Sequence, residues 1–329
     1  MRAITIDAYG GPEVVRLRDD APIPVAGPGE VLVKVVCAGV NFMDIHTRQG
    51  KYAESRTYPV RIPCTLGMEG AGIVVATGPG VTRPAVGQRV AWCIAWGSFA
   101  EYAAIPARLA AAIPDAIGFD TAAAAMFQGC TAHYLVHDVA RLQPGDSCLI
   151  HAASGSIGQI LIQMAKRIGA SVYATASTDD KRTVALRRGA DTALPYADGA
   201  FADRVRALRG GLGVDVVFDS LGKATLRDSM RATRPRGLIV NYGNVSGSVT
   251  DLDPYELGEA GSLFLTRPRL ADHMADAATV QRRADDIFGA ILDRSLVIEI
   301  ADRYAFDQIP HGHARIEARE QIGKAVAWI

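Results

Sequence analysis

The sequence has few of the features that mark secreted, membrane-spanning or nucleic-acid-binding proteins. Its 329 residues include only five cysteines, an odd and unclustered set that favours free thiols in a reducing compartment. No apolar run approaches the roughly 18 residues that a membrane-spanning helix needs, and the first residues lack the layout of a signal peptide. Lysine plus arginine and aspartate plus glutamate both number 35, so no excess positive charge favours nucleic acid or anionic membranes. We therefore expect a cytoplasmic globular protein without membrane or nucleic-acid partners.

The length predicts about two domains, and the pattern of strands and helices changes along the chain. Over residues 1–124, short β-branched segments alternate with Gly-Pro turns, which predicts a compact, irregular β-barrel without helical crossovers. The strands expected there are Ala3–Ala8, Val14–Leu17, Glu30–Ala38, Ile73–Ala76 and Arg89–Ile94.

Over residues 125–294, helical and strand patterns alternate, which predicts a doubly wound parallel sheet. The expected strands are Ser147–His151, Ser171–Ala176, Thr192–Pro195, Val214–Asp219, Gly237–Tyr242 and Ser262–Thr266. Helices are expected over 121–140, 156–169, 179–189, 198–209, 222–234 and 277–294. Residues 295–329, with strands expected at 296–301, 304–306 and 324–329 and a helix at 307–319, are too few to fold alone. We expect them to return to the first domain.

The segment Gln143–Ser177 has the order strand, small-residue turn, helix, strand, which is typical of a dinucleotide-binding unit. A small-residue turn lets the backbone approach a pyrophosphate, and the helix N-terminus offers it unpaired N–H groups. Gly155 and Gly158 occupy the second and third glycine positions of the usual motif, whereas Ala153 takes the first. Small residues also occur wherever a helix packs closely on a strand, but both flanks of this turn favour the cofactor interpretation.

The end of the second strand of this unit distinguishes two nicotinamide cofactors. NAD-binding proteins place a carboxylate there, where it bonds the free ribose hydroxyl. Here the position is Ser177, with Lys181 four residues later, and this pair suits a 2′-phosphate better. Asp179 and Asp180 argue the other way, unless they lie in the first turn of the next helix. The sequence therefore favours NADPH.

Five motifs together resemble one family. The segments are Ala38–Asp44, Arg48–Gly50, Leu66–Gly72, Ala152–Gly158 and Asn241–Gly247, and the similarity continues through Ser262–Pro268. They are similar to the zinc-free, NADPH-dependent quinone oxidoreductases related to ζ-crystallin, within the medium-chain dehydrogenase/reductase superfamily. The resemblance implies an α/β protein with a GroES-like β-barrel catalytic domain (1–124 and 295–329) and a Rossmann cofactor domain (125–294).

The resemblance also implies which residues bind NADPH. It assigns Thr131 to the nicotinamide–phosphate region, Gly155, Ser156 and Ile157 to the pyrophosphate, and Ser177, Lys181 and Tyr196 to the adenosine phosphate. It assigns Asn241, Tyr242, Gly243, Asn244 and Ser246 to the loop over the ribose and nicotinamide, together with Leu265, Thr266 and Arg267 from the next strand. Asn41 and Arg319 would reach the cofactor from the other domain, although Arg319 is equally well explained as a surface charge.

The resemblance implies no metal. Zinc dehydrogenases of the superfamily have Cys where Asn41 stands and His-Glu where Met68 and Glu69 stand, and Asn and Met are poor substitutes for those ligands. The remaining candidates have no ligand spacing; they are Cys37, Cys64, Cys130, His46 and Glu69. Without a Lewis acid, we expect acceptors that take hydride readily, such as quinones and conjugated enones.

Four residues are the candidates for the reacting centre. Asn41 and Tyr52 would provide hydrogen-bonding and stacking groups, and Asp44 matches the family's pocket acid. The alternative for Asn41 and Asp44 is that they are turn residues with side chains bonded to backbone. His46 stands where related proteins tend to have Tyr; it would either donate a proton to the reduced oxygen or be an exposed loop histidine.

The function expected from these features is NADPH-dependent quinone reduction, by hydride or single-electron transfer, in a cleft between the domains. One alternative is an enone or enoyl-thioester reductase on the same scaffold, and another is a non-catalytic NADPH-binding protein. If residues 262–267 form the last strand of the sheet, its unpaired edge and the family resemblance imply a homodimer.

Overall fold

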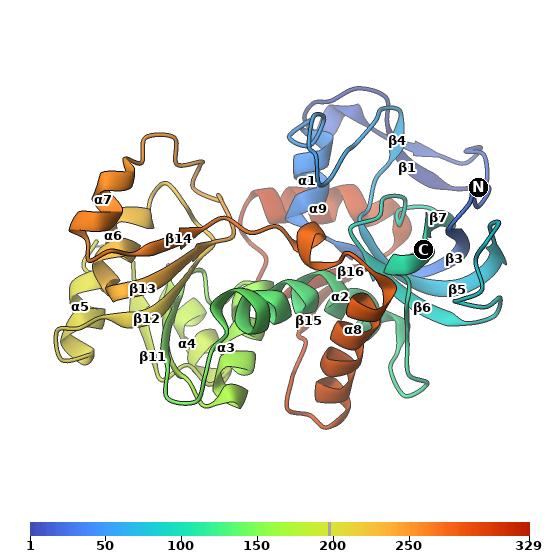
Figure 1. The fold of residues 1–329 in the computed structure, drawn as a ribbon. Helices are drawn as coiled ribbons and strands as arrows, with labels where there is room; N and C mark the ends of the chain where they lie inside the picture. Colours follow the sequence, from blue (N-terminus) through green and yellow to red (C-terminus); the bar gives the residue numbers. More distant parts are fainter. Residues whose placement is uncertain (197–198) are drawn as a thin grey trace. The chain divides into compact units, whose positions relative to one another are not determined.

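The computed structural model describes residues 1–196 and 199–329, which form two compact units (Figure 1). Unit 1 comprises Met1–Cys130 and Ala271–Ile329, and unit 2 comprises Thr131–Leu270. No helix of the described residues is long and apolar enough to cross a membrane.

Unit 1 is built on two β-sheets. The larger has seven strands, in the order β15-β16-β3-β5-β6-β8 with β7 paired to β3. Its strands are β3 (Glu30–Val40), β5 (Glu69–Thr77), β6 (Arg89–Cys93), β7 (Tyr102–Pro106), β8 (Ala111–Ala112), β15 (Ile300–Tyr304) and β16 (Lys324–Trp328). The smaller sheet has the order β2-β1-β4 and consists of β1 (Ala3–Ile6), β2 (Val15–Arg18) and β4 (Cys64–Thr65).

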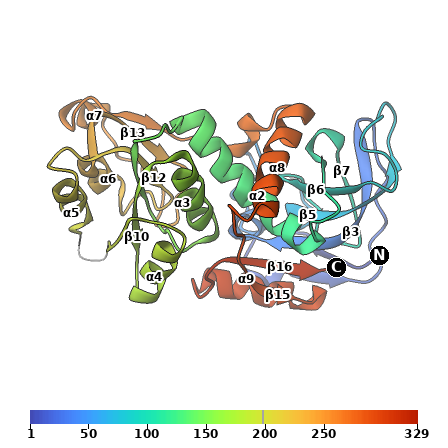
Figure 2. The ribbon, with the colours of Figure 1, turned by 90° about the horizontal axis from the view of Figure 1, so that it is seen from below.

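The C-terminal segment returns to unit 1, as predicted. β16 pairs antiparallel with β3, from Ala325 opposite Val40 to Trp328 opposite Cys37. Figure 2 shows the red strands β15 and β16 beside the blue strand β3. This pairing places the start of β16 next to the end of β3, so residues almost 300 positions apart share one part of the sheet.

The helices of unit 1 differ from the predictions in several places. α1 (Phe42–Arg48) follows β3 directly and was not predicted, because seven residues are too few to show a helical period. α8 (Ala277–Leu292) was predicted for the second domain, but it packs on β8 in unit 1, where the Gln281 side chain accepts a 2.9 Å bond from Ala112 N. α9 (Ile309–Glu317) lies within its predicted range, and β15 begins four residues later than the strand predicted at 296.

Unit 2 is a doubly wound sheet of six parallel strands, ordered β11-β10-β9-β12-β13-β14. They are β9 (Ser147–Ile150), β10 (Ser171–Ala176), β11 (Thr192–Pro195), β12 (Val214–Asp219), β13 (Thr233–Asn241) and β14 (Phe264–Thr266). The predicted α/β class is therefore confirmed. Each strand is rich in apolar residues because both faces of a parallel sheet are covered by helices.

Helices cover both faces of this sheet. α3 (Ser156–Ile168) and α4 (Asp179–Arg187) lie on one side, and α5 (Phe201–Leu208) and α6 (Leu226–Ala232) lie on the other (Figure 2). The predicted helix 198–209 begins outside the described residues, and α7 (Pro254–Glu259) was not predicted.

α2 (Phe119–Tyr134) runs into a π-helical turn at Leu135–Ala140, which ends at Arg141 in the left-handed region. Single 3₁₀ turns lie at Pro12–Val14, Ala107–Leu109, Leu270–His273 and Phe306–Gln308.

Candidate active site

The predicted cofactor residues of unit 2 gather at one edge of its sheet, where all six strands end. Ser177 follows β10, and Tyr196 follows β11, whose last residue is in register with the last residue of β10. Asn241 ends β13 and Thr266 ends β14. The strand order reverses between β9 and β12, and ligands of such sheets bind outside the strand ends at that point. We call this the carboxyl edge.

The turn between β9 and α3 has the geometry that a bound phosphate needs. Gly155 is the N-cap of α3 and has no side chain to bond the first N–H groups of the helix. A Cβ on Gly158 would lie 2.7 Å from both Ala152 O and Ala153 Cα, so only glycine allows this helix to approach the strand so closely. Gly155, Ser156 and Ile157 are partly exposed, and the helix N-terminus is therefore accessible to an anion.

Thr131 has a buried hydroxyl that forms no hydrogen bond with any of the described residues. The residue as a whole is only 5 % exposed, so water has little access to Oγ1. A buried hydroxyl without a partner costs free energy, so such a group calls for a ligand atom or water.

The two carboxylates that follow β10 lie at the start of the next helix, α4. Ser177 is exposed, and Thr178 caps α4 by accepting a 3.3 Å bond from Lys181 N. Asp179 and Asp180 lie in the first turn of α4, where carboxylates are stabilised by the helix dipole. Asp179 also pairs with Arg182. The two carboxylates are thus explained by the helix, and the position after the strand is left to a hydroxyl.

The loop after β13 is held against the loop after β12. Asn241 Nδ2 bonds the carbonyl oxygens of Gly243 and Asp219, and Ser246 Oγ donates to Leu221 O at 2.7 Å. A Cβ on Gly243 would lie 2.2 Å from Ser220 O, so the two loops touch backbone to backbone. Asn241 and Ser246, predicted to bind cofactor, therefore also fix the shape of the loop that contains Tyr242 and Asn244.

A set of buried polar side chains at the carboxyl edge is joined by hydrogen bonds and was not predicted from the sequence. The carboxylate of Asp219 accepts bonds from the backbone N–H groups of Leu221 and Gly222, and its Oδ2 accepts a 3.0 Å bond from Ser229 Oγ. His151 Nε2 lies 2.9 Å from Ser229 Oγ, and His151 Nδ1 lies 2.7 Å from Thr175 Oγ1. Its sequence signal was a polar residue at the end of each apolar strand: His151 after β9 and Asp219 at the end of β12.

The donor and the acceptor of each hydrogen bond in this set can be assigned. Ser229 donates its proton to Asp219, so its oxygen accepts from His151 Nε2–H, and His151 Nδ1 accepts from Thr175. Burial lowers the pKa of His151, against the opposing effect of Asp219, and keeps the ring neutral. The ends of β9, β10 and β12 are thereby joined by one continuous set of hydrogen bonds.

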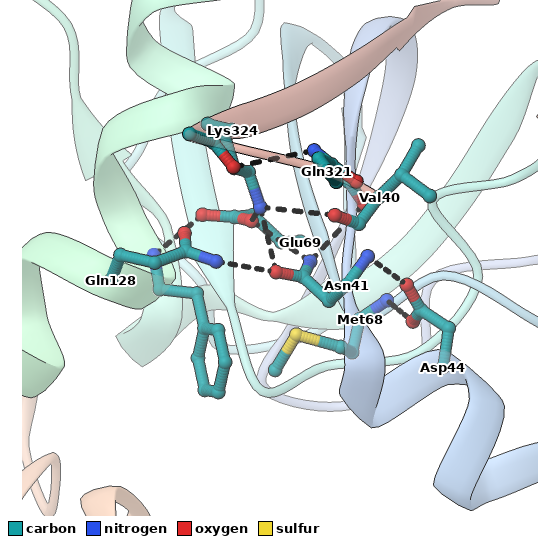
Figure 3. Close-up of polar contacts among 11 residues, drawn as sticks. Val40, Asn41, Asp44, Met68, Glu69, Gln128, Gln321 and Lys324 are labelled. Atoms are coloured by element: carbon teal, nitrogen blue, oxygen red, sulfur yellow. Dashed lines mark hydrogen bonds and ion pairs between the residues drawn. The ribbon is translucent and has the colours of Figure 1, made fainter. Parts of the chain in front are cut away.

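In unit 1, the side chain of Asn41 lies in a buried network rather than in an open pocket (Figure 3). Its Nδ2 donates to Glu69 Oε2 at 3.0 Å and to Gly39 O at 3.2 Å. Its Oδ1 accepts from Gln128 Nε2 at 2.7 Å and from Lys324 Nζ at 2.6 Å. We call Asn41, Glu69, Gln128 and Lys324 the Lys324 network. Gln128 and Lys324 were missed, because four distant segments contribute and no local pattern links them.

Asp44 orients the backbone at the start of α1. Its carboxylate accepts bonds from Asn41 N at 2.8 Å and from Met68 N at 3.2 Å. Burial raises the pKa of Asp44 to about 8, against these two backbone donors, which lower it. The structure thus places Asp44 in the loop-orienting arrangement that was the alternative to a pocket acid.

Unit 1 also contains a packed group of apolar and aromatic side chains that we call the aromatic cluster. Its members are Met43, Tyr52, Tyr58, Met68, Ile94, Trp96, Phe127 and Ala271. The Tyr52 and Tyr58 rings meet edge to face at 5.7 Å, and Tyr52 Oη lies 3.4 Å from His46 Nδ1. Lys51 Nζ lies 2.9 Å from His46 Nε2, so the charged amine makes Nε2 an acceptor.

The remaining predicted cofactor residues lie on β14 and α4 of unit 2 and, for Arg319, in unit 1. Leu265 and Thr266 belong to β14, and Arg267 follows it directly. Lys181 is the third residue of α4. Arg319 lies in unit 1, is exposed, and has a positive φ of 60° just after α9. Their cofactor contacts remain predictions.

Family models match both parts of the chain. One described as "Alcohol dehydrogenase GroES-like domain" matches residues 27–115, and one described as "Zinc-binding dehydrogenase" matches residues 156–271. A quinone oxidoreductase of Pseudomonas aeruginosa is 37% identical over 326 residues, which cover 99% of this chain and 98% of that protein. The chain belongs to the quinone oxidoreductase family of the medium-chain dehydrogenase/reductase superfamily.

Two further relatives extend the comparison within the quinone oxidoreductase family. A 2-haloacrylate reductase of Burkholderia sp is 34% identical over 331 residues, 98% of both chains. The crystal structure of Escherichia coli quinone oxidoreductase complexed with NADPH has a TM-score of 0.94 and 32% identity and covers all of both chains. The expected architecture, a GroES-like domain with a Rossmann-like cofactor domain, is thereby confirmed.

The residues of this chain do not fit the zinc that one family description mentions. The ammonium of Lys324 is bonded to the side chains of Asn41 and Glu69, two of the positions at which zinc dehydrogenases were expected to have ligands. Burial raises the pKa of Cys37 to about 12, which disfavours the thiolate that zinc binds. Within residues 1–196 and 199–329, no group of three or more His, Cys, Asp or Glu is arranged to hold a metal.

His46 can be tested by its pH dependence. Burial and, secondly, the Lys51 ammonium lower the pKa of His46 to about 4, so the ring is neutral from about pH 5 upward. We expect His46→Phe to leave the shape of the pH–rate profile unchanged between about pH 5.5 and 8. Steady-state rates over this range measure it. Loss of an ionisation between pH 6 and 7 in the variant, roughly the range of an ordinary histidine, would assign His46 a proton-transfer role.

Proposed function

We propose that this chain is an NADPH-dependent reductase of quinones. The observation that supports it most is the carboxyl edge: a glycine turn shaped for a pyrophosphate, with Ser177 in place of a carboxylate at the end of β10. The full-length similarity to quinone oxidoreductases, one of them solved with NADPH, supports both the acceptor and the cofactor.

On the cofactor side, each part of NADPH has a matching group in unit 2. The N-terminus of α3 and the N–H groups of Ser156 and Ile157 would bind the pyrophosphate. Ser177 and Lys181 would bind the 2′-phosphate, and the unused hydroxyl of Thr131 would bond near the nicotinamide. When bound, NADPH supplies the hydride that reduces the acceptor.

On the acceptor side, the aromatic cluster includes the partly exposed side chains of Tyr52, Trp96 and Phe127, against which a quinone ring would pack. Tyr52 and Tyr58 are held edge to face, and the neutral His46 orients the Tyr52 hydroxyl. Quinones are electrophilic enough that the chain need only bind the ring, exclude water and orient the acceptor oxygen. Tyr52 is the residue we propose to hydrogen-bond that oxygen.

The test is oxidation of NADPH and NADH with a panel of acceptors: 1,4-benzoquinone, 9,10-phenanthrenequinone, an alkenal, 2-chloroacrylate and crotonyl-CoA. Quinone turnover with NADPH preferred supports the proposal. Turnover confined to the alkenal, chloroacrylate or thioester would favour carbon–carbon double-bond reduction, a second candidate for which the full-length 2-haloacrylate reductase relative argues. Tight NADPH binding without turnover of any acceptor would favour a non-catalytic binding protein.

Ser177→Asp should reverse the cofactor preference. A carboxylate after β10 would bond a free ribose hydroxyl but repel a 2′-phosphate. We expect the Kd for NADPH to rise by at least about tenfold, because like charges in contact cost several kcal/mol, and NADH binding to improve. Titration of nicotinamide fluorescence measures both. Ser177→Ala is the matched control; it removes the hydroxyl without adding charge and should weaken NADPH binding much less.

The exposed edge of the unit 2 sheet supports a homodimer. β14 ends the strand order within the described residues, and Phe264 on it is 61% exposed. A charged residue on an edge strand opposes pairing between sheets. We therefore expect Phe264→Lys to be monomeric under conditions in which the unchanged chain is dimeric, as measured by light scattering after gel filtration. Leu212→Lys, at a 64% exposed side chain elsewhere in unit 2, should leave the mass unchanged.

A further inference from the structure

The ammonium of Lys324 is a buried cation at the centre of unit 1. The Lys324 side chain is 3% exposed, and its partner Glu69 is fully buried. Nζ lies 2.6 Å from Glu69 Oε2 and 2.6 Å from Asn41 Oδ1, and 3.5 Å from Val40 O. Resting on the proposed reductase function, we propose that Lys324 is a built-in cation that takes the place of a metal ion and positions the aromatic cluster for the acceptor.

The first argument is that the network leaves Asn41 only one orientation. Both protons of Nδ2 are donated, to Glu69 and Gly39, and Oδ1 accepts from Gln128 and Lys324. Turning the amide by half a rotation would aim its N–H groups at the Lys324 ammonium and its oxygen at the Glu69 carboxylate. Figure 3 shows the side chains of Lys324, Asn41 and Glu69 converging. They come from the start of β16, the residue after β3 and the start of β5. The cation therefore holds Oδ1 of Asn41 towards Lys324 and Nδ2 towards Glu69.

The second argument is that the network holds the backbone of the aromatic cluster. Glu69 Oε1 accepts a bond from Phe127 N, and Glu69 follows Met68 directly. Met43 lies two residues after Asn41, within α1. Met43, Met68 and Phe127 are all members of the cluster. Three of its side chains are thus attached to backbone that Lys324 and Glu69 hold in place.

The third argument is that the site is packed around this ammonium. A Cβ on Gly39 would lie 2.1 Å from Glu69 Oε2 and 3.0 Å from Lys324 Nζ. The glycine leaves room for the ion pair and for nothing larger. A cation that is part of the chain neutralises Glu69 without needing open coordination positions, which a catalytic metal site requires.

The deciding variant is Lys324→Met, which keeps the length of the side chain and removes its charge. We expect kcat/KM for the quinone to fall at least about tenfold, chiefly through KM, because small displacements of binding groups cost this much or more. The Kd for NADPH should change less than about twofold, since the carboxyl edge belongs to unit 2. Lys34→Met, at an exposed lysine of β3, is the matched control. Its kcat/KM and its Kd for NADPH should equal those of the unchanged chain.

A purely structural role is separated by the double variant Lys324→Met with Glu69→Gln. It removes both charges, so no unpaired ion stays buried and the melting temperature should recover most of the loss of the single variant. We expect kcat/KM to stay low, because no ammonium orients Asn41. Recovery of both stability and kcat/KM would overturn the proposal, and so would stoichiometric zinc in the purified protein.

The proposed function and this inference fail in different ways. Absence of turnover by the unchanged chain with every acceptor would refute the reductase function. Positioning would then be measured by acceptor binding, because all three tryptophans (Trp92, Trp96 and Trp328) lie in unit 1 and saturable quenching of their fluorescence by a quinone reports on that unit. Equal quenching affinity in Lys324→Met and the unchanged chain would refute the inference alone.

Discussion

Glu69→Ala should lower the free energy of unfolding of unit 1 by about 3–5 kcal/mol, the usual cost of leaving one buried charge without its partner. The Lys324 ammonium would retain Asn41 Oδ1 and the more distant Val40 O, and both are neutral. Asn41 Nδ2 and Phe127 N would each lose an acceptor as well. Urea unfolding followed by tryptophan fluorescence measures this directly, because the three tryptophans lie in unit 1.

Glu101→Ala is the matched control for this measurement. Glu101 also forms an ion pair in unit 1, with Arg2, but both side chains are more than a third exposed. Exposed pairs contribute roughly 0–1 kcal/mol, so this variant should unfold close to the unchanged chain. A Glu69→Ala loss as small as that of Glu101→Ala would mean that water reaches the Lys324 ammonium.

Gly158→Ala should weaken NADPH binding severely. The new Cβ would meet Ala152 O and Ala153 Cα at 2.7 Å, and backbone atoms must then move apart. Overpacking of this kind costs about 1–3 kcal/mol. Because the displaced atoms form the pyrophosphate turn itself, we expect the Kd to rise roughly 5- to 150-fold. Nicotinamide fluorescence titration measures it.

Gly258→Ala provides the comparison for Gly158→Ala. Gly258 lies in α7 of unit 2, and a Cβ there would meet nothing within 4 Å. Alanine in a helix interior is favoured over glycine by about 1 kcal/mol, so this variant should bind NADPH normally and be slightly more stable. Equal NADPH affinity in the two variants would show that the turn at Gly158 does not contact the cofactor.

Unit 2 was predicted well because its signals are local. The strands Ser171–Ala176, Thr192–Pro195 and Val214–Asp219 have the predicted bounds, since each is a short apolar run between turn residues. The turn at Gly155 and Gly158 is a motif of adjacent residues. The same locality explains why Ser177 could be placed at the end of β10.

Unit 1 was predicted less well because its site depends on distant pairings. Lys324 begins an apolar strand, and a lysine there is ordinarily expected at the surface; only the pairing of β16 with β3 buries it against Glu69. The amphipathic pattern of α8 gives its apolar face but not the sheet on which that face packs. Asn41 and Asp44 are close enough in sequence for their contact to be expected, and Asp44 accepts a bond from Asn41 N. The bonds of Asn41 to Gln128 and Lys324 required the fold.

The pairing of β3 with β16 also sets an order of events during synthesis on the ribosome. Residues of unit 2 all emerge before β16, so its parallel sheet can form while β3 still lacks its neighbour. Domains whose residues are contiguous fold as they emerge. In the first segment of unit 1, Met1–Cys130, the edge of β3 stays unpaired until β16 is synthesised. Glu69 likewise has no ion-pair partner until Lys324 is synthesised. The middle of this chain is therefore expected to fold before its beginning.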